Sequence, residues 1–214
     1  MEIIKYPSAD KWQQLSQRAL ADKASEVKAI VTDIIANVVK GGDVAVKEYE
    51  QRFTGASLDS LAVSDQEIAE ASMLVSDELK EAIETARKNI EAFHKAQATE
   101  VEVITAPGVK CIQRQVPITK VGLYVPGGNS PLFSTVLMLA VPAVIAGCEE
   151  IILCTPAGKD GKVHPAILYA ANVAGIKQIF KTGGAQAIAA MAYGTETIPA
   201  VYKIFGQKNP YNDI

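Results

Sequence analysis

The sequence lacks the features of a membrane-spanning, secreted or nucleic-acid-binding protein. No apolar run reaches the roughly eighteen residues that a transmembrane helix needs. The N-terminal stretch "MEIIKYPSADKW" lacks the basic and then apolar order of a signal peptide. The net charge of −3 provides no broad basic field that could hold a nucleic acid. We therefore expect a globular protein that binds neither membranes nor nucleic acids.

Cysteine and histidine are scarce, which limits the disulfide and metal chemistry that the sequence can offer. The three cysteines, Cys111, Cys148 and Cys154, show no CxxC spacing, and we expect reduced thiols in a cytoplasmic protein. The two histidines, His94 and His164, are too far apart for a metal-ligand motif, and neither HExxH nor a cysteine quartet occurs. The sequence alone therefore assigns no metal ligand.

Helical periodicity dominates residues 1–100. The segment "ASEVKAIVTDIIANVVKGG" places apolar residues three and four apart, and Gly41-Gly42 predicts its end. Asp43 is then expected to cap the next helix, and "SDQE" at Ser64–Glu67 is a capping box. The following helix, "SDELKEAIETARKNIEAFHKAQ", is amphipathic. Its expected inward residues are Leu79, Ile83, Ala86, Ile90 and Phe93.

The periodicity changes near residue 100, where strand-like segments begin. "EVEVITAPGVKCIQRQVPI" predicts a hairpin that turns at Pro107-Gly108. Four strands are then predicted in "KVGLYV", "EEIILCTP", "IKQIFKT" and "VYKIF", with helices between them. This alternation indicates an α/β fold in which a helical N-terminal region precedes an incomplete Rossmann-like module with a mostly parallel sheet. We expect residues 1–100 and 101–214 to correspond to these two parts of one continuous folding unit.

Two strand-to-helix turns, "YVPGGNS" and "KTGGAQA", carry a double glycine. Such turns lie at the carboxyl edge of a parallel sheet, where ligands bind, and free amides at a helix start favour phosphate or another anion. Neither turn is a GxGxxG fingerprint or a Walker loop. Spacing alone leaves open whether these glycines bind a ligand or only make tight turns.

The other candidate residues favour structural roles. His94 is expected at a helix surface or core edge, and His164, before Pro165, as a helix cap or an exposed side chain. Cys154 ends an apolar strand and is expected to be a buried, inert thiol. Its alternative role, as the nucleophile of an aldehyde dehydrogenase-like enzyme, has no histidine partner nearby in the sequence.

The ordered segments "RQVPITKVGLYVPGGNSPLFSTVLMLAVPAVIAGC" and "TGGAQAIAAMAYGTETIPAVYKIFG" resemble histidinol dehydrogenase, as does "GGDVAVKEYEQRF" before them. The resemblance covers nearly the whole chain up to about Gly206. It implies a homodimer with Rossmann-like modules that oxidises L-histidinol to L-histidine in two NAD-dependent steps, with the help of zinc.

The resemblance also implies cofactor-binding residues. Tyr124 matches the tyrosine that contacts NAD in the YVPGG segment, and Gln186 matches the glutamine of the GGAQA segment. Asn209 aligns with the asparagine that closes the family's FGPGN segment, although Gln207-Lys208 replaces its Pro-Gly. The family's zinc ligands and catalytic glutamate-histidine pair lie downstream of that segment, so no catalytic or metal-binding residue is assigned here.

Two hypotheses follow for the chain. The first is an N-terminal half of a histidinol dehydrogenase-like enzyme that is inactive alone, because hydride loss from a hydroxyl also needs a base. The second is a non-catalytic dinucleotide-binding or oligomerisation module. If the sheet is cut after its fourth strand, we expect self-association or a rearranged C-terminus.

Overall fold

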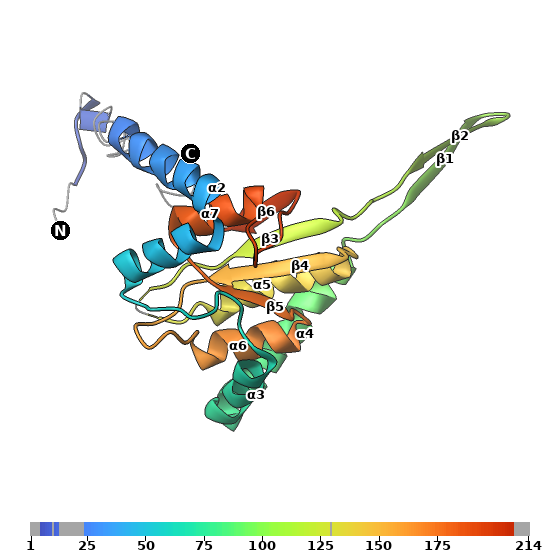
Figure 1. The fold of residues 1–214 in the computed structure, drawn as a ribbon. Coiled ribbons are helices and arrows are strands. Elements are labelled where there is room, and N and C mark those ends of the chain that lie inside the picture. The colour runs from blue at the N-terminus through green and yellow to red at the C-terminus, as the bar shows by residue number, and fades with distance from the viewer. Residues whose placement is uncertain (1–4, 10, 13–23, 129, 208–214) are drawn as a thin grey trace.

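A parallel sheet of four strands forms the centre of the molecule (Figure 1). The computed structural model describes residues 5–9, 11–12, 24–128 and 130–207. The strand order is β5-β4-β3-β6, and all three pairings are parallel. The strands are β3 (Lys120–Tyr124), β4 (Glu150–Thr155), β5 (Gln178–Lys181) and β6 (Lys203–Gly206). The predicted α/β class with a mostly parallel sheet is confirmed.

Helices cover both faces of this sheet (Figure 1). On one face α7 contacts the strands and α2 packs on α7; on the other, α5 contacts the strands, and α6 and α4 pack on α5 while α3 packs on α6. The helices are α2 (Ala24–Thr54), α3 (Asp65–Leu74), α4 (Asp77–Lys95), α5 (Phe133–Ile145), α6 (Pro165–Val173) and α7 (Gly184–Tyr193).

The two-residue period of the strands divides the core into two clusters. Ile152 and Cys154 of β4 pack with α2 and α7, whereas Leu153 packs with α3 to α6. All three side chains are completely buried. Because successive side chains point to opposite faces, a strand covered on both sides must be apolar throughout, which explains the sequence "EIILC".

The helix α2 bends at Gly42, whose φ of 53° and ψ of −136° are not helical. Glycine adopts this left-handed φ without the cost that a Cβ would add. The predicted interruption at Gly41-Gly42 is thus present, although α2 continues beyond it. The Asp43 carboxylate, expected to cap the next helix, instead accepts hydrogen bonds from the Thr197 backbone N–H and hydroxyl. Glu196 Oε2 accepts the Asp43 N–H at 2.8 Å, so the bend is fixed to the loop after α7.

The capping box at the start of α3 is confirmed. Ser64 Oγ accepts the Glu67 N–H at 3.2 Å, and Glu67 Oε2 accepts the Ser64 N–H at 2.9 Å. The amphipathic helix α4 buries Ile83, but Phe93, predicted to face inward, is 65% exposed. Phe93 lies in the last turn of α4, and the periodicity of a single helix does not show which of its turns a neighbouring element covers.

A hairpin of β1 (Val101–Ala106) and β2 (Val109–Gln113) projects away from the body of the molecule (Figure 1). Its turn at Pro107-Gly108 is the predicted one, with Gly108 at φ 79°. Every residue of both strands is exposed. The hairpin therefore presents apolar side chains to solvent.

The segment before α3 pairs with the edge of the sheet. Val63 N donates to Ile179 O at 2.9 Å, and Lys181 N donates to Leu61 O at 2.7 Å. These bonds attach the helical region to β5. The division of the chain at residue 100 remains a prediction.

Candidate functional site

The two cofactor-binding residues predicted within the described chain lie together. Tyr124, at the end of β3, and Gln186, in the first turn of α7, line one cavity of about 740 Å³. This volume lies within the roughly 300–1,000 Å³ of small-molecule and cofactor pockets. The cavity, which we call the edge cavity, opens at the carboxyl ends of the parallel strands, where open α/β sheets bind ligands.

The bend of α2 forms one wall of the edge cavity. Residues from before the bend, such as Ile34, and from after it, such as Arg52 and Phe53, line the same space. The opposite wall is the turn that leads into α7, and Pro126 and Gly127 contribute from the loop after β3. The cavity thus depends on the Gly42 bend, because a straight helix could not present both of its halves to one site.

Tyr124 links β3 to the glycine turn before α7. Its hydroxyl oxygen accepts the Gly184 N–H at 3.0 Å, and the side chain is almost completely buried. Burial raises the pKa of the Tyr124 hydroxyl, so the group stays protonated and its hydrogen remains available to donate. On the neighbouring strand β6, a Cβ at Gly206 would lie 2.7 Å from the Tyr124 backbone oxygen. Glycine at 206 is therefore required for the backbone of β3 to approach β6 this closely.

Gln186 is held by a residue that the sequence analysis missed. Glu50 of α2 is completely buried, and its Oε1 accepts from Gln186 Nε2 at 2.9 Å. Gln186 Oε1 is buried without a hydrogen-bond partner among the described residues. Glu50 lies four residues after the buried Val46, on the inward stripe of α2. An acidic residue on an apolar stripe was the available signal in the sequence.

The two double-glycine turns differ from open phosphate-binding loops. In the second turn, the Gly183 N–H is donated to Glu50 Oε1 at 2.8 Å, and the Gly184 N–H to Tyr124. These two amides are therefore not free to bind an anion, because side chains of the protein already accept their hydrogen bonds. In the first turn, Gly127 packs on Pro156 and lines the edge cavity.

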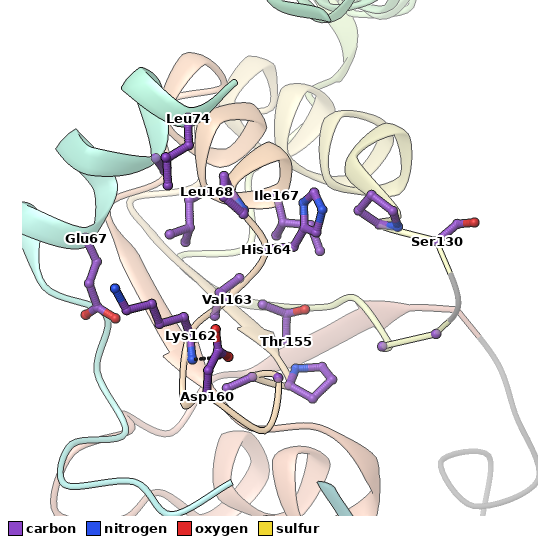
Figure 2. Close-up of a pocket in the computed structure, with 18 of the residues that line it drawn as sticks. Glu67, Leu74, Ser130, Thr155, Asp160, Lys162, Val163, His164, Ile167 and Leu168 are labelled. Carbon is purple, nitrogen blue, oxygen red and sulfur yellow. Dashed lines mark hydrogen bonds between the residues drawn. The ribbon is translucent and has the colours of Figure 1, made fainter. Parts of the chain in front are cut away.

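A second cavity, of about 540 Å³, lies beside the loop after β3 (Figure 2). Pro126, Gly127 and Pro156 line both cavities. In the second cavity, Thr155 and His164 lie beside the charged Asp160 and Lys162 (Figure 2). The buried Thr155 hydroxyl has no hydrogen-bond partner among the described residues. The mixed charges of this cavity favour no single ligand class.

The remaining candidate residues take structural roles. His164 is the N-cap of α6, with Nδ1 accepting the Ala166 N–H at 3.2 Å, and His94 Nδ1 lies 2.8 Å from Gln97 Oε1. Cys154 is completely buried, and burial raises the pKa of its thiol well above the ordinary value. The predicted burial of Cys154 is confirmed, and a buried thiol with a raised pKa favours the structural role over that of a thiolate nucleophile.

Two further features that the sequence analysis addressed are metal ligands and Asn209. Within the described ranges, no three His, Cys, Asp or Glu side chains gather where they could hold a metal ion. Asn209 lies outside the described residues, and its proposed role stays a prediction. Among the described helices, none is long and apolar enough to cross a membrane.

The fold and the edge cavity define an α/β protein with a parallel sheet and a ligand-sized cleft at the carboxyl ends of its strands. The model of the histidinol dehydrogenase family matches residues 17–213. The chain therefore belongs to the histidinol dehydrogenase family.

The relatives that this chain matches are longer than the chain itself. Histidinol dehydrogenase of Bacteroides fragilis is 57% identical over 99% of this chain and 49% of the relative. That of Xanthomonas campestris is 49% identical over 95% of this chain and 48% of the relative. The crystal structure of histidinol dehydrogenase from Elizabethkingia anophelis matches with a TM-score of 0.86 and 44% identity, over 96% of this chain and 48% of that chain. The chain spans about half the length of the relatives it matches.

Proposed function

We propose that this protein takes part in the NAD-dependent oxidation of L-histidinol to L-histidine, and that this chain supplies the dinucleotide-binding part. The observation that carries the proposal is the position of Tyr124 and Gln186 in one cavity at the carboxyl edge of the sheet. The family membership of the chain supports the reaction class. Bound NAD would accept the hydride that leaves the substrate carbon.

The edge cavity has the polar and apolar groups that a dinucleotide requires. Among the described residues, the buried Gln186 Oε1 has no hydrogen-bond partner, and the Tyr124 hydroxyl retains a hydrogen to donate. Phe53 and Pro126 offer apolar surface to a ring, and Arg52 offers a positive charge to a phosphate. This combination of a mostly apolar wall with a few convergent polar groups is typical of cofactor sites.

Zinc does not fit the described residues, since they contain no suitable ligand group. We therefore assign this chain no step that involves zinc or substrate oxidation. We propose that the chain alone binds NAD without reducing it, and that the protein works in the cytoplasm as a homodimer, as the resemblance implies.

Calorimetric titration of the 214-residue chain with NAD⁺ tests the cofactor site. We expect saturable binding, weakened about tenfold in Gln186→Ala because the ligand loses a buried hydrogen-bonding group. Gln178→Ala, an exposed glutamine on β5, is the matched control and should bind as the original chain does. Absence of binding, or equal weakening in both variants, would contradict the proposal.

A turnover assay tests the proposal that this chain alone binds NAD but does not catalyse the oxidation of L-histidinol. The chain is incubated with NAD⁺, L-histidinol and zinc, and NADH is followed by its absorbance. We expect no NADH above the background without protein. Sustained NADH formation that requires L-histidinol would show that the chain is a complete catalyst.

One observation favours an oligomerisation module as the second candidate function. The β1–β2 hairpin projects from the body and exposes apolar side chains on both strands, including Ile104 at 72% and Val109 at 49%. Such a surface is typical of protein association.

A further inference from the structure

Glu50 is a buried acid that the proposed chemistry does not use. None of the ion pairs in the described part of the chain includes it, and its Oε2 has no hydrogen-bond partner there. Lys181, which precedes Thr182 in the sequence, pairs with Glu67 at 2.6 Å. Burying an acid without a cation is costly, so its retention in the core requires other compensation.

Three donors on one turn supply that compensation. Glu50 Oε1 accepts from the Thr182 hydroxyl at 2.9 Å, from the Gly183 N–H at 2.8 Å and from Gln186 Nε2 at 2.9 Å. Gly183 is the N-cap of α7, so this oxygen also lies at the positive end of the helix dipole. This is the environment that a phosphate oxygen occupies in a glycine-rich turn. Glu50 fills it from inside the protein.

The same bonds determine which way the Gln186 amide faces. Glu50 Oε1 accepts the Gly183 backbone N–H, so its lone pairs face the turn. The Gln186 side-chain atom that lies 2.9 Å from this oxygen is therefore the NH₂ group, which donates to it. The amide oxygen is then directed toward Gly184, where a Cβ would lie 2.7 Å from it. Both Gly184 and Gln186 line the edge cavity, whereas Glu50 lies behind them.

We propose that Glu50 is a positioning residue that occupies the anion site of the Thr182–Gln186 turn, and so shapes this wall of the edge cavity for an uncharged part of the dinucleotide instead of its phosphates. The proposal rests on the proposed function, because it assumes that the edge cavity binds NAD. The phosphates then bind away from this turn, whose Gly183 amide is already taken.

Hydrogen exchange of the Gly183 amide tests whether Glu50 anchors the Thr182–Gln186 turn, and it needs no cofactor. Glu50→Ala removes the acceptor, and we expect exchange at Gly183 to accelerate at least about tenfold relative to Leu153 in the sheet core, which reports global opening. Glu50→Gln keeps an oxygen at the same place and should restore protection to within about threefold. Val46→Ala, a buried residue one turn earlier on α2, is the matched control and should leave that ratio unchanged.

Thr182→Val provides a milder variant if Glu50→Ala does not fold. It removes one of the three donors while the side-chain shape is nearly kept. Exchange at Gly183 relative to Leu153 should then rise about threefold, since a partly loosened network opens more often. Unchanged exchange at Gly183 in both Glu50→Ala and Thr182→Val, or equal acceleration in Val46→Ala, would overturn the anchor.

Binding measurements test the effect on the ligand. We expect the dissociation constant for NAD⁺ to rise about tenfold in Glu50→Ala and to recover in Glu50→Gln. Inorganic pyrophosphate should leave the Gly183 amide resonance of the original chain in place, since Glu50 occupies the turn. Tighter NAD⁺ binding by Glu50→Ala, or a pyrophosphate-induced shift at Gly183, would overturn the proposal. If the original chain binds no NAD⁺, the proposed function fails, while hydrogen exchange still tests the anchor.

Discussion

At the scale of single residues, the Tyr124 hydroxyl connects strand β3 to the start of α7. Tyr124→Phe removes the acceptor of the Gly184 N–H and the hydrogen that the hydroxyl can donate. We expect the dissociation constant for NAD⁺ to rise about fivefold, the value of one hydrogen bond. Tyr193→Phe, whose side chain is 61% exposed, is the control. If calorimetry gives equal affinities for Tyr124→Phe and the original chain, this hydroxyl takes no part in binding.

Glu67 makes the stability of the chain depend on pH. Burial pushes the pKa of Glu67 up, but hydrogen bonds from Lys181 and Ser64 and the charge of Lys181 outweigh it, so the pKa lies below its ordinary 4.5. A lowered folded-state pKa contributes stability above 4.5, which is lost as the pH falls through the folded value.

Urea unfolding of Glu67→Gln tests this dependence. At neutral pH its free energy of unfolding should be lower by about 1 kcal/mol, the value of the partly buried ion pair with Lys181, because glutamine can keep the capping bond. The difference should vanish as the pH falls through the folded pKa. Asp77→Asn removes a 95% exposed carboxylate from a surface ion pair with Lys80 and should lose no more than about 0.5 kcal/mol. A difference between Glu67→Gln and the original chain that persists in acid would rule out this origin.

At the scale of elements, the Gly42 bend places both halves of α2 around the edge cavity. Gly42→Ala combines a φ of 53° with a clash against the Glu196 carboxylate. We expect a loss of about 2–3 kcal/mol in unfolding free energy, because the left-handed φ is strained and the Glu196 carboxylate must move out of its hydrogen bond with the Asp43 N–H. Gly175→Ala, at φ 87° with open space around it, introduces backbone strain alone and should lower the free energy of unfolding by about 1 kcal/mol. Equal losses would show that Glu196 does not restrict this position.

The sequence was sufficient for the elements but not for the contacts between them. Hydrophobic periodicity located strands such as "KVGLYV", and the Pro-Gly pair located the hairpin turn at Pro107-Gly108. It could not place Glu50 beside Gln186, because 136 residues separate them and only the packing of α2 on α7 joins them. It likewise assigned Asp43 to a local cap, whereas the structure gives that carboxylate to Thr197, 154 residues away. Periodicity and capping rules consider only residues close in the sequence, so they cannot identify partners this far apart.

At the scale of the whole molecule, the projecting β1–β2 hairpin is the surface on which we expect association. Ile104→Lys should lower the self-association constant about tenfold or more in analytical ultracentrifugation, because a charge replaces an apolar contact. Met73→Lys places the same charge on an equally exposed apolar side chain of α3 and should have no effect. A chain that stays monomeric at every concentration would contradict the prediction.

The position of the bound dinucleotide tests the central claim that the edge cavity is the cofactor site. The two cavities share Pro126, Gly127 and Pro156 but differ in their remaining residues, so they can be distinguished by nuclear magnetic resonance. On titration with NAD⁺, we predict saturable shifts of the amide resonances of Phe53, Tyr124 and Gln186, and none at Thr155 or His164. Shifts confined to Thr155 and His164, or no shifts at all, would contradict the account.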